Sequence, residues 1–231
     1  MRPIPSSHTR TDARPAGTSP VEEAIAAFRR GEPVLVHDAD DREGETDLLY
    51  PAGAVSTEAV ARLRNDAGGL LFVAVPDEVA EAFDLPYLHE ELSHPAADFD
   101  DVGYDARPSF SLTVNHRDTF TGITDEDRSL TVRTLAAAAD APAEIDFAAE
   151  FRAPGHVHVL RAAAGLLTER EGHTELGVAL ALAADREPAV AGCEMLDDTT
   201  GTALPAAAAR DYAARHGIPF VEGSAVIDEL G

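Results

Sequence analysis

Apolar positions recur along the chain with two different periods, and the change between them predicts alternating helices and strands. Residues 21–30 have apolar side chains at helical spacing, with Ser19 and Pro20 as a start signal and Gly31 as a stop. Residues 33–36 form a short apolar run, as expected of a buried strand. The same reasoning predicts further helices over 56–64, 124–139, 174–184 and 205–216, and further strands over 70–75, 110–114, 156–161, 189–195 and 220–221.

This order of elements favours an α/β (or α+β) fold, in which helices cover a mixed β-sheet within one layered domain over residues 19–231. Residues 1–18 contain Arg, Ser, Thr and Pro but lack the apolar run of a secretory signal, so we expect a disordered leader. The acidic residues 38–47 are predicted to form a loop at a strand end. Residues 86–108, dense in His, Asp and Glu, are predicted to form a long loop able to cover a site.

The composition is that of an ordinary globular protein. The 231 residues are 45% hydrophobic, which is enough to bury a core without disulfides or a structural metal. The single cysteine, Cys193, excludes an intrachain disulfide. No segment approaches the roughly 18 apolar residues that a membrane-spanning helix requires. We therefore expect a soluble, cytoplasmic protein.

The net charge narrows the choice of partners. It is −24, from 42 acidic residues against 18 basic ones, all of which are arginine. A polyanion releases no counterions from nucleic acid and is repelled by an anionic membrane, so neither is expected as a partner. Molar salt shortens the Debye length to about 3 Å and screens the self-repulsion, which favours a halophilic source. The alternative is an acidic mesophilic protein from a GC-rich genome, which would also be rich in Ala and Arg.

Two segments carry candidate ligand-binding chemistry. The first follows a predicted strand and holds acids around one arginine, with Arg42, Glu43, Glu45 and Asp47 as candidates and Asp41 as a weaker one. Carboxylate oxygens of this kind suit Mg²⁺, although so acidic a chain also produces such clusters as solvated surface. The second opens a predicted helix, where backbone N–H groups could hold a phosphate together with Arg170, Glu171, Gly172, His173 and Thr174. The alternative is an ordinary helix start capped by Thr174.

Two further residues are candidates for proton transfer. His156 follows Pro154 and Gly155, and glycine allows a close approach of the backbone. Glu194, with Cys193, lies at the end of the apolar run 189–192, where a partly desolvated carboxylate could act as a base. The alternatives are a structural histidine and a buried, hydrogen-bonded glutamate. The other histidines have no comparable neighbours and receive no role: His37, His89, His94, His116, His158 and His216.

Read in order, several segments resemble the motif series of the 3,4-dihydroxy-2-butanone 4-phosphate synthases, from about Val21 to Ile227. They are DREGETD, FSLTV, TFTGITDEDR, RAPGHVHVLRA, GLLTEREGHTE and AVAGCEMLDDTTGT. A series of motifs in the right order is far more specific than one short match. The resemblance implies a homodimeric lyase of riboflavin biosynthesis. It would convert ribulose 5-phosphate into 3,4-dihydroxy-2-butanone 4-phosphate and formate, with two Mg²⁺ (or Mn²⁺) ions per site and no organic cofactor.

The resemblance also implies residue roles. Glu43 and His173 would be the metal ligands, and Arg170, Glu171, Gly172, His173 and Thr174 would hold the substrate phosphate. His156 and Glu194 would transfer protons during the reaction, and Glu194 would also contact substrate. The remaining substrate contacts would be Arg42, Glu45, Asp47 and Thr121. Thr121 precedes a helix for which Thr124 and Asp127 predict a capping box.

The chain departs from the family pattern at three places. Thr46 replaces a common glycine and could stiffen the acidic loop, because only glycine readily adopts positive φ angles. Phe120 replaces a threonine, and Ala203-Leu204-Pro205 replaces methionine-alanine-arginine. Two other functions therefore stay open. One is a metal-dependent sugar-phosphate isomerase or aldolase, and the other is a catalytically silent sugar-phosphate-binding protein.

Overall fold

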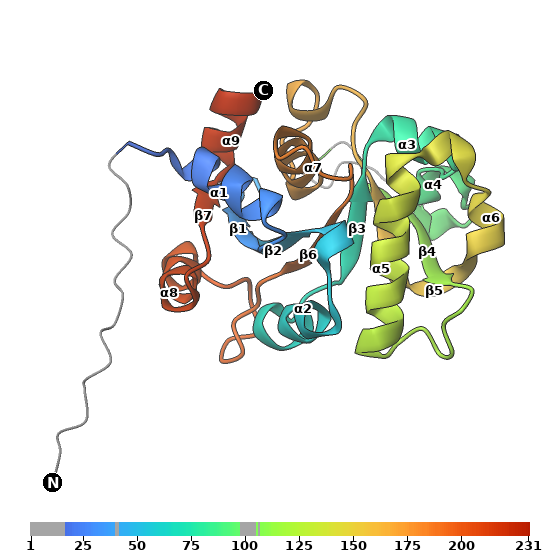
Figure 1. The fold of residues 1–231 in the computed structure, drawn as a ribbon, viewed down its shortest axis with the longest axis horizontal. Coiled ribbons are helices and arrows are strands. Elements are labelled where there is room, and N and C mark those ends of the chain that lie inside the picture. Colours follow the sequence, from blue (N-terminus) through green and yellow to red (C-terminus); the bar gives the residue numbers. More distant parts are fainter. Residues whose placement is uncertain (1–16, 40–41, 98–104, 106) are drawn as a thin grey trace, which may run out of the picture.

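The computed structural model describes residues 17–39, 42–97, 105 and 107–231, and within them one mixed sheet of seven strands (Figure 1). The strand order is β4-β5-β3-β6-β2-β1-β7. The strands are β1 (Val34–His37), β2 (Thr46–Pro51), β3 (Phe72–Val75), β4 (Phe110–His116), β5 (Phe151–Arg161), β6 (Val190–Glu194) and β7 (Phe220–Glu222). β3 is parallel to β5 and antiparallel to β6, which makes the sheet mixed as predicted.

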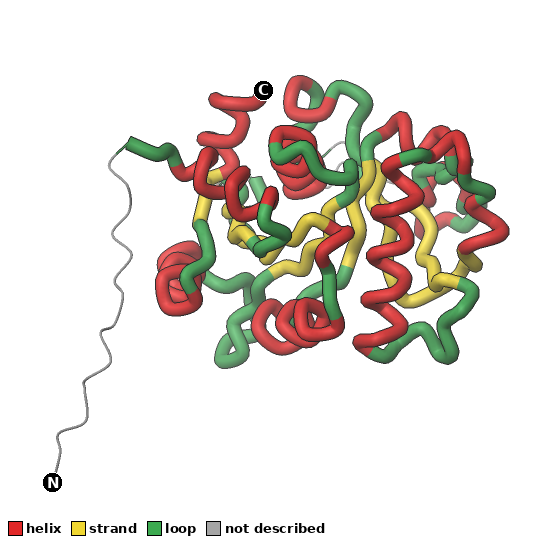
Figure 2. Tube along the Cα trace, viewed as in Figure 1, coloured by secondary structure: helices red, strands yellow, loops and turns green. Residues whose placement is uncertain are grey.

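Helices cover both faces of this sheet (Figures 1 and 2). One face carries α1 (Pro20–Arg29), α7 (His173–Ala183) and α9 (Gly223–Leu230). The other face carries α2 (Thr57–Arg62), α3 (Asp77–Ala82), α5 (Asp125–Asp140) and α8 (Ala206–His216). The short helices α4 (Leu88–Glu91) and α6 (Phe147–Glu150) lie near β4 and β5. Among the described helices, none has the length and apolar character to cross a membrane.

Two hydrophobic cores form because successive side chains of a strand point to opposite faces of the sheet. Leu35 and Leu48 are fully buried in the core under α2 and α5, whereas Val36 and Leu49 are fully buried in the core under α1, α7 and α9. β2 is buried at every position, as expected of a strand covered on both sides. The catalytic candidates therefore sit at strand ends, where the two cores stop.

Local signals explain the helix boundaries. The Ser19 hydroxyl accepts the N–H of Glu22 at 3.1 Å and begins α1, and Gly31, with φ of 75°, follows its end. The predicted capping box at Thr124 is half right. Thr124 accepts the N–H of Asp127 at 3.1 Å, but the Asp127 carboxylate accepts from the backbone of residues 120–122 instead of from Thr124.

The structure contains every predicted helix and strand, with boundaries shifted by a few residues and β5 extended to begin at Phe151. Five of the described helices and strands were missed, namely β2, α3, α4, α6 and α9. The prediction of a loop over 38–47 is wrong at its end, because Thr46 and Asp47 already belong to β2. Within 86–108, the described residues include α4 and a 3₁₀ turn over Pro95–Ala97. Residues 1–16 of the predicted leader lie outside the described residues.

Register brings the candidate residues together on the α7 face of the sheet. Asp47 of β2 pairs with Glu194 of β6, and in the next row Phe72 of β3 lies between Gly192 and His158. A side chain at Gly192 would collide with the rings and methyl groups of Phe72 and Leu49. The sheet therefore presents two carboxylates side by side at one end of adjacent antiparallel strands.

Candidate active site

A cavity of about 400 Å³ lies on the α7 face, where β2 and β6 carry Asp47 and Glu194. Acidic side chains gather at one end and arginines lie beside them, and Arg42 joins the two groups, because its Nη1 atom is 2.8 Å from Oδ2 of Asp38 and 3.3 Å from Oε1 of Glu43. Aromatic and aliphatic side chains form part of the wall. The lining residues are Arg42, Glu43, Glu45, Asp47, Phe72, Asp105, Arg107, Pro108, Ser109, Phe110, Leu160, Arg170, His173, Thr174 and Glu194. The cavity thus offers adjacent places for a cation and for an anion.

The acidic end provides a set of ligands for a metal ion. One ligand atom each from Asp38, Glu43 and His173 lies within 4.8 Å of the others. The Nδ1 atom of His173 is 3.4 Å from Oε2 of Glu43, and its Nε2 atom is 3.8 Å from Oδ1 of Asp47. Nε2 of His173 and Oδ1 of Asp47 are both buried without a hydrogen-bond partner among the described residues. Buried orphan atoms of this kind fit a site completed by a cation.

The charges of this end are strongly coupled. Burial would raise the pKa of Glu43, but its hydrogen bond to His173 and the charge of Arg42 hold that pKa below its usual value. Burial alone would lower the pKa of His173, yet Asp47, Glu43 and Asp38 raise it to about 9. Burial, with the charges of Glu194 and Glu43, raises the pKa of Asp47 to about 7 against the opposing charge of His173. The acids around His173 therefore favour a positive charge at this end of the cavity, which either a proton on His173 or a bound cation would supply.

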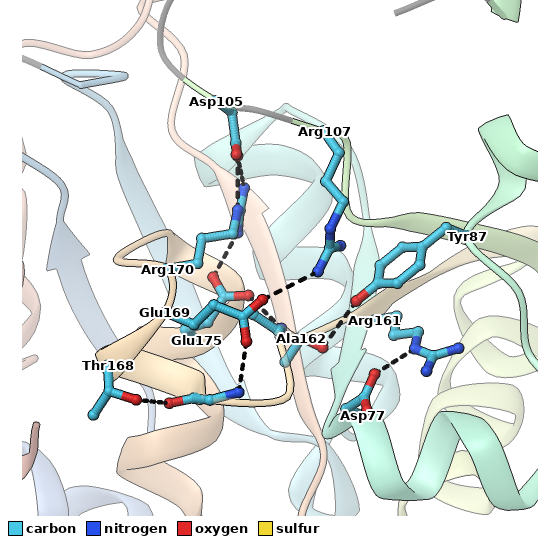
Figure 3. Close-up of polar contacts among 12 residues, drawn as sticks. Asp77, Tyr87, Asp105, Arg107, Arg161, Ala162, Thr168, Glu169, Arg170 and Glu175 are labelled. Carbon is cyan, nitrogen blue, oxygen red and sulfur yellow. Dashed lines mark hydrogen bonds and ion pairs between the residues drawn. The ribbon is translucent and has the colours of Figure 1, made fainter.

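The arginine end is built around Arg170, just before α7 (Figure 3). Nη1 of Arg170 donates to Oε2 of Glu175 at 2.5 Å, and Nε donates to Oδ2 of Asp105 at 2.7 Å. Arg42 donates to the same Asp105 oxygen at 3.1 Å. A side chain at Gly172 would push against the guanidinium group of Arg170 and touch that of Arg42, so glycine leaves room for both arginines in this arrangement. Two guanidinium groups thus converge at the start of a helix.

The beginning of α7 has no side-chain cap among the described residues. Gly172 is the N-cap, while Thr174 lies inside the first turn and is buried, so the alternative of a Thr174 cap is wrong. The first N–H groups of an uncapped helix attract anions through their hydrogen-bond donors and the helix dipole. Together with Arg170, this is an anion-binding arrangement.

Glu194 lies within the cavity. Its Oε2 atom accepts the N–H of Leu70 at 2.6 Å, and Gly69 packs so closely that a side chain there would collide with the carboxylate. Glu45 also lines the cavity, and burial together with the charges of Glu43 and Glu194 raises its pKa. The backbone contact fixes Glu194 while leaving its second oxygen available to a ligand.

His156 and Thr121 are exposed and do not line the cavity. The His156 backbone N–H donates to Oδ1 of Asn115 at 2.8 Å, and its Nδ1 atom lies 3.3 Å from the same oxygen. Gly155 allows this approach, because a side chain there would collide with the backbone of Val114, as the sequence predicted. His156 lies two residues before His158, which pairs with Phe72 of the cavity wall, but a bulge of β5 against β4 interrupts the regular pairing between Arg152 and Val157.

Thr121 lies in the turn between β4 and α5. Its N–H and hydroxyl groups both donate to Oδ2 of Asp127, at 3.2 and 3.3 Å. On either side of it, Phe120 is 94% exposed and Ile123 is 52% exposed. Within one chain, Thr121 and His156 therefore lie on the exposed surface and outside the cavity.

A family model described as 3,4-dihydroxy-2-butanone 4-phosphate synthase matches residues 22–229. The chain belongs to the 3,4-dihydroxy-2-butanone 4-phosphate synthase family. The synthase of Archaeoglobus fulgidus is 50% identical over 219 residues, which is 90% of this chain and 92% of that protein. The synthase of Saccharomyces cerevisiae is 35% identical and covers 92% of this chain and 96% of its own.

Solved synthase structures share the fold. That of the Candida albicans synthase superposes with a TM-score of 0.77 at 30% identity, covering 92% of this chain and 98% of its own. A synthase in complex with two magnesium ions has a TM-score of 0.72 at 33% identity, covering 88% and 93%. The predictions of family, α/β fold and synthase activity in riboflavin biosynthesis are confirmed.

Three further residues singled out in the sequence, Glu171, Gly172 and Thr46, do not line the cavity of this synthase. Glu171 is exposed and does not line the cavity, and Gly172 lies beneath the arginines. Asp41 lies outside the described residues. Thr46, where the family often has glycine, is the first residue of β2, fully buried, with its hydroxyl 3.0 Å from Nδ1 of His37. Its φ angle is not positive, and it belongs to a strand and not to the loop before it, so the effect of Thr46 on the acidic loop stays a prediction.

Sequence reasoning missed three acids of the site: Asp38, Asp105 and Glu175. Asp38 follows β1 directly, and an acid at a strand end was a usable signal. Asp105 and Glu175 gave none, since each is identified only by its contact with Arg170, and Asp105 is 65 residues away from it in the chain. The positions after Thr202 also keep ordinary geometry, with Ala203 bridging to Leu196 and Pro205 preceding α8.

Proposed function

We propose that this cavity binds D-ribulose 5-phosphate and converts it to L-3,4-dihydroxy-2-butanone 4-phosphate and formate. The observation that carries the proposal is the polarity of the cavity. Unpartnered ligand atoms of Asp47 and His173 offer a place for a cation, and Arg42 and Arg170 converge beside it, next to the uncapped helix that begins at His173. An open-chain sugar phosphate has the matching polarity, with oxygens for a cation at one end and a phosphate at the other.

Divalent cations, Mg²⁺ or Mn²⁺, are proposed at the acidic end, with Glu43 and His173 as ligands. The donor set supports this, because carboxylate oxygens with one imidazole suit such ions. Two ions per site are proposed by analogy with the solved synthase that holds two magnesium ions. The cations supply Lewis-acid stabilisation of negative charge on substrate oxygens. No organic cofactor is proposed.

The phosphate is proposed to lie against Arg170 and the first turn of α7, with Glu171 to Thr174 contributing through that turn. Glu175 supports this role, because it is fully buried and holds Nη1 of Arg170 at 2.5 Å. A guanidinium fixed on one side presents its other edge in a defined direction. Arg42, Glu45 and Asp47 are proposed to contact the rest of the sugar chain.

Proton removal at C3 of the substrate, and its return, are proposed to involve Glu194 and His156. The Glu194 carboxylate is held by the Leu70 N–H within the cavity. The His156 imidazole is oriented by Asn115 but stands outside the cavity of its own chain. A histidine so placed can reach substrate only if something else brings it there.

We propose that a second copy of the chain does so, in a homodimer. The exposed apolar side chains Phe120 and Ile123 flank Thr121, and contiguous exposed apolar side chains often mark an interface. A two-fold axis near this surface would bring His156 and Thr121 of one copy to the cavity of the other. Each active site would then combine residues from both chains.

The net charge supports a proposal about the compartment, the salt concentration and the partners of the enzyme. The net charge of −24 supports a cytoplasmic protein that works in concentrated salt, without nucleic acid or membrane as a partner. Residues 19–231 are proposed as one catalytic domain, because the sheet takes its strands from β1 near the start to β7 near the end.

The test is to incubate the purified protein with ribulose 5-phosphate in concentrated KCl, with Mg²⁺ or with EDTA, and to follow the products by NMR. We expect one formate for each four-carbon ketone phosphate, with Mg²⁺ only. A phosphorylated isomer or cleavage product without formate would replace the proposal with an isomerase or aldolase. Binding of substrate by folded protein without any product would leave a sugar-phosphate-binding protein.

A further inference from the structure

One carboxylate oxygen in the cavity accepts three hydrogen bonds from arginine side chains. Oδ2 of Asp105 accepts from Nη2 of Arg42 at 3.1 Å and from Nε of Arg170 at 2.7 Å. It also accepts from Nη2 of Arg170. Donors from two guanidinium groups thus converge on a single anionic oxygen, as they would on an oxygen of a phosphate.

The two acids that contact Arg170 are not equivalent (Figure 3). Glu175 is fully buried and also accepts the N–H of Ala163 at 2.9 Å, so it is part of the framework. Asp105 differs in that it lines the cavity and is partly exposed. It accepts hydrogen bonds from the two arginines and from the backbone of Arg107, two residues along its own loop. The edge of Arg170 that faces the cavity is therefore the edge that Asp105 occupies.

Asp105 carries a negative charge in this position. Burial would raise its pKa, but its hydrogen bond to Arg170 and the charges of Arg170 and Arg42 lower it below its usual value. An ionised carboxylate tied to the chain is always present at high local concentration. It consequently competes with any anion from solution for the same two guanidinium groups.

We propose that Asp105 is a specificity-determining residue, whose carboxylate occupies the place of the substrate phosphate and is displaced when the phosphate binds. This inference rests on the proposed phosphate position at Arg170. A phosphate ester carries more charge than a carboxylate and offers three oxygens, so it can also use the uncapped N–H groups of α7. Chloride, a carboxylic acid and an unphosphorylated sugar lack this combination of charge and three oxygens. They therefore do not displace the Asp105 carboxylate from the arginines, and Asp105 excludes them from the phosphate position.

The test measures the affinity of the full-length protein for inorganic phosphate by titration calorimetry in EDTA, at low and at molar KCl. Asp105→Asn and Asp105→Ala remove the competing charge, so we expect phosphate to bind about tenfold more tightly at low KCl. Chloride should weaken phosphate binding more in these variants than in the native protein. Asp105→Glu restores a carboxylate and should return the affinity toward the native value.

Asp198→Asn is the matched control, because Asp198 is an exposed acid that does not line this cavity. It removes the same unit of charge and should leave phosphate affinity nearly unchanged. Equal or weaker phosphate binding by folded Asp105→Asn and Asp105→Ala, verified by thermal unfolding, would overturn the inference. Formate release is measured separately on the native protein, so failure of the proposed reaction would be recognised independently of the phosphate titration.

Discussion

The cavity and the exposed surface around Thr121 and His156 both hold residues of the same family motifs, yet they differ in how completely one chain builds them. In the cavity, charged side chains contact one another, and Glu194 also contacts the backbone of Leu70 just before β3. At the exposed surface, Thr121 and His156 are held by Asp127 and Asn115, and apolar side chains beside them face solvent. We infer that a single chain preorganises binding, whereas the proton-transfer geometry depends on assembly.

The largest expected effect tests directly whether each active site combines residues from two chains. Glu194→Gln and His156→Gln should each reduce formate release by about a thousandfold or more, because each removes a proposed proton-transfer group. When the two variants are refolded together, heterodimers would contain one intact site. About one quarter of native activity should then return for a random two-fold assembly.

The matched control is a mixture of Glu194→Gln with Glu43→Gln. Both changes lie in the cavity, so every heterodimer site keeps one defect and no activity should return. Recovery in the first mixture but not in the second identifies sites shared between chains. If neither mixture recovers although dimers form, His156 acts within its own chain or not at all.

The next effect concerns the apolar surface. Phe120→Asp places a charge where a second copy would bury an aromatic ring, so the dimer should dissociate and activity should fall by at least about tenfold. Light scattering after size exclusion measures the mass, and formate release measures activity. Leu182→Asp alters another exposed apolar residue, on α7, and should remain dimeric. A Phe120→Asp protein that stays dimeric and active places the interface elsewhere.

A smaller effect is expected within the cavity. Glu175→Gln keeps the shape of the side chain but loses the charge that holds Arg170, so KM for ribulose 5-phosphate should rise by about tenfold, with a smaller change in kcat. Glu169→Gln, at an acid that is 51% exposed and 3.8 Å from Arg107, should change KM by less than about twofold. Equal effects of the two variants would show that general charge, and not the position of Arg170, governs binding.

The smallest effect should come from restoring the family's common glycine. Thr46→Gly removes the contact with His37 and loosens the first residue of β2, which should lower the free energy of unfolding by about 1–2 kcal/mol. Catalysis should change by less than about twofold, because Thr46 is buried in the strand and does not line the cavity. Denaturant unfolding and kcat test the two statements, and a tenfold gain in kcat would show that Thr46 does restrain the site.

The sequence was sufficient where apolar burial dominates local structure. The buried runs of β3 and β6 and the amphipathic α1 were predicted from periodicity alone. β2 was missed because Thr46 and Asp47 are polar residues buried at the site, which interrupts the apolar signal. The first half of β5 was missed because Pro154 and Gly155 argue against a strand, although they lie at its bulge against β4.

The site was predictable to the extent that its residues are close in sequence. The acidic segment and the start of α7 were each found as a unit, and the structure brings Glu43 and His173 within hydrogen-bonding range of one another. The contact of Asp105 with Arg170 is a product of the fold, so no local pattern could reveal it. The position of His156 outside the cavity is likewise set by tertiary structure, and no local pattern in the sequence reveals it.

The packing of α1 against α9 has a consequence for how the chain can be reconnected. The Ser19 hydroxyl donates to a carboxylate oxygen of Glu229 at 3.1 Å, so the two ends of the described fold are neighbours (Figure 1). A short linker between them, with new ends opened at the exposed turn 198–201, would give a circular permutant with the same packing. The active site would then depend on which segments are adjacent in space, and not on which of them the ribosome makes first.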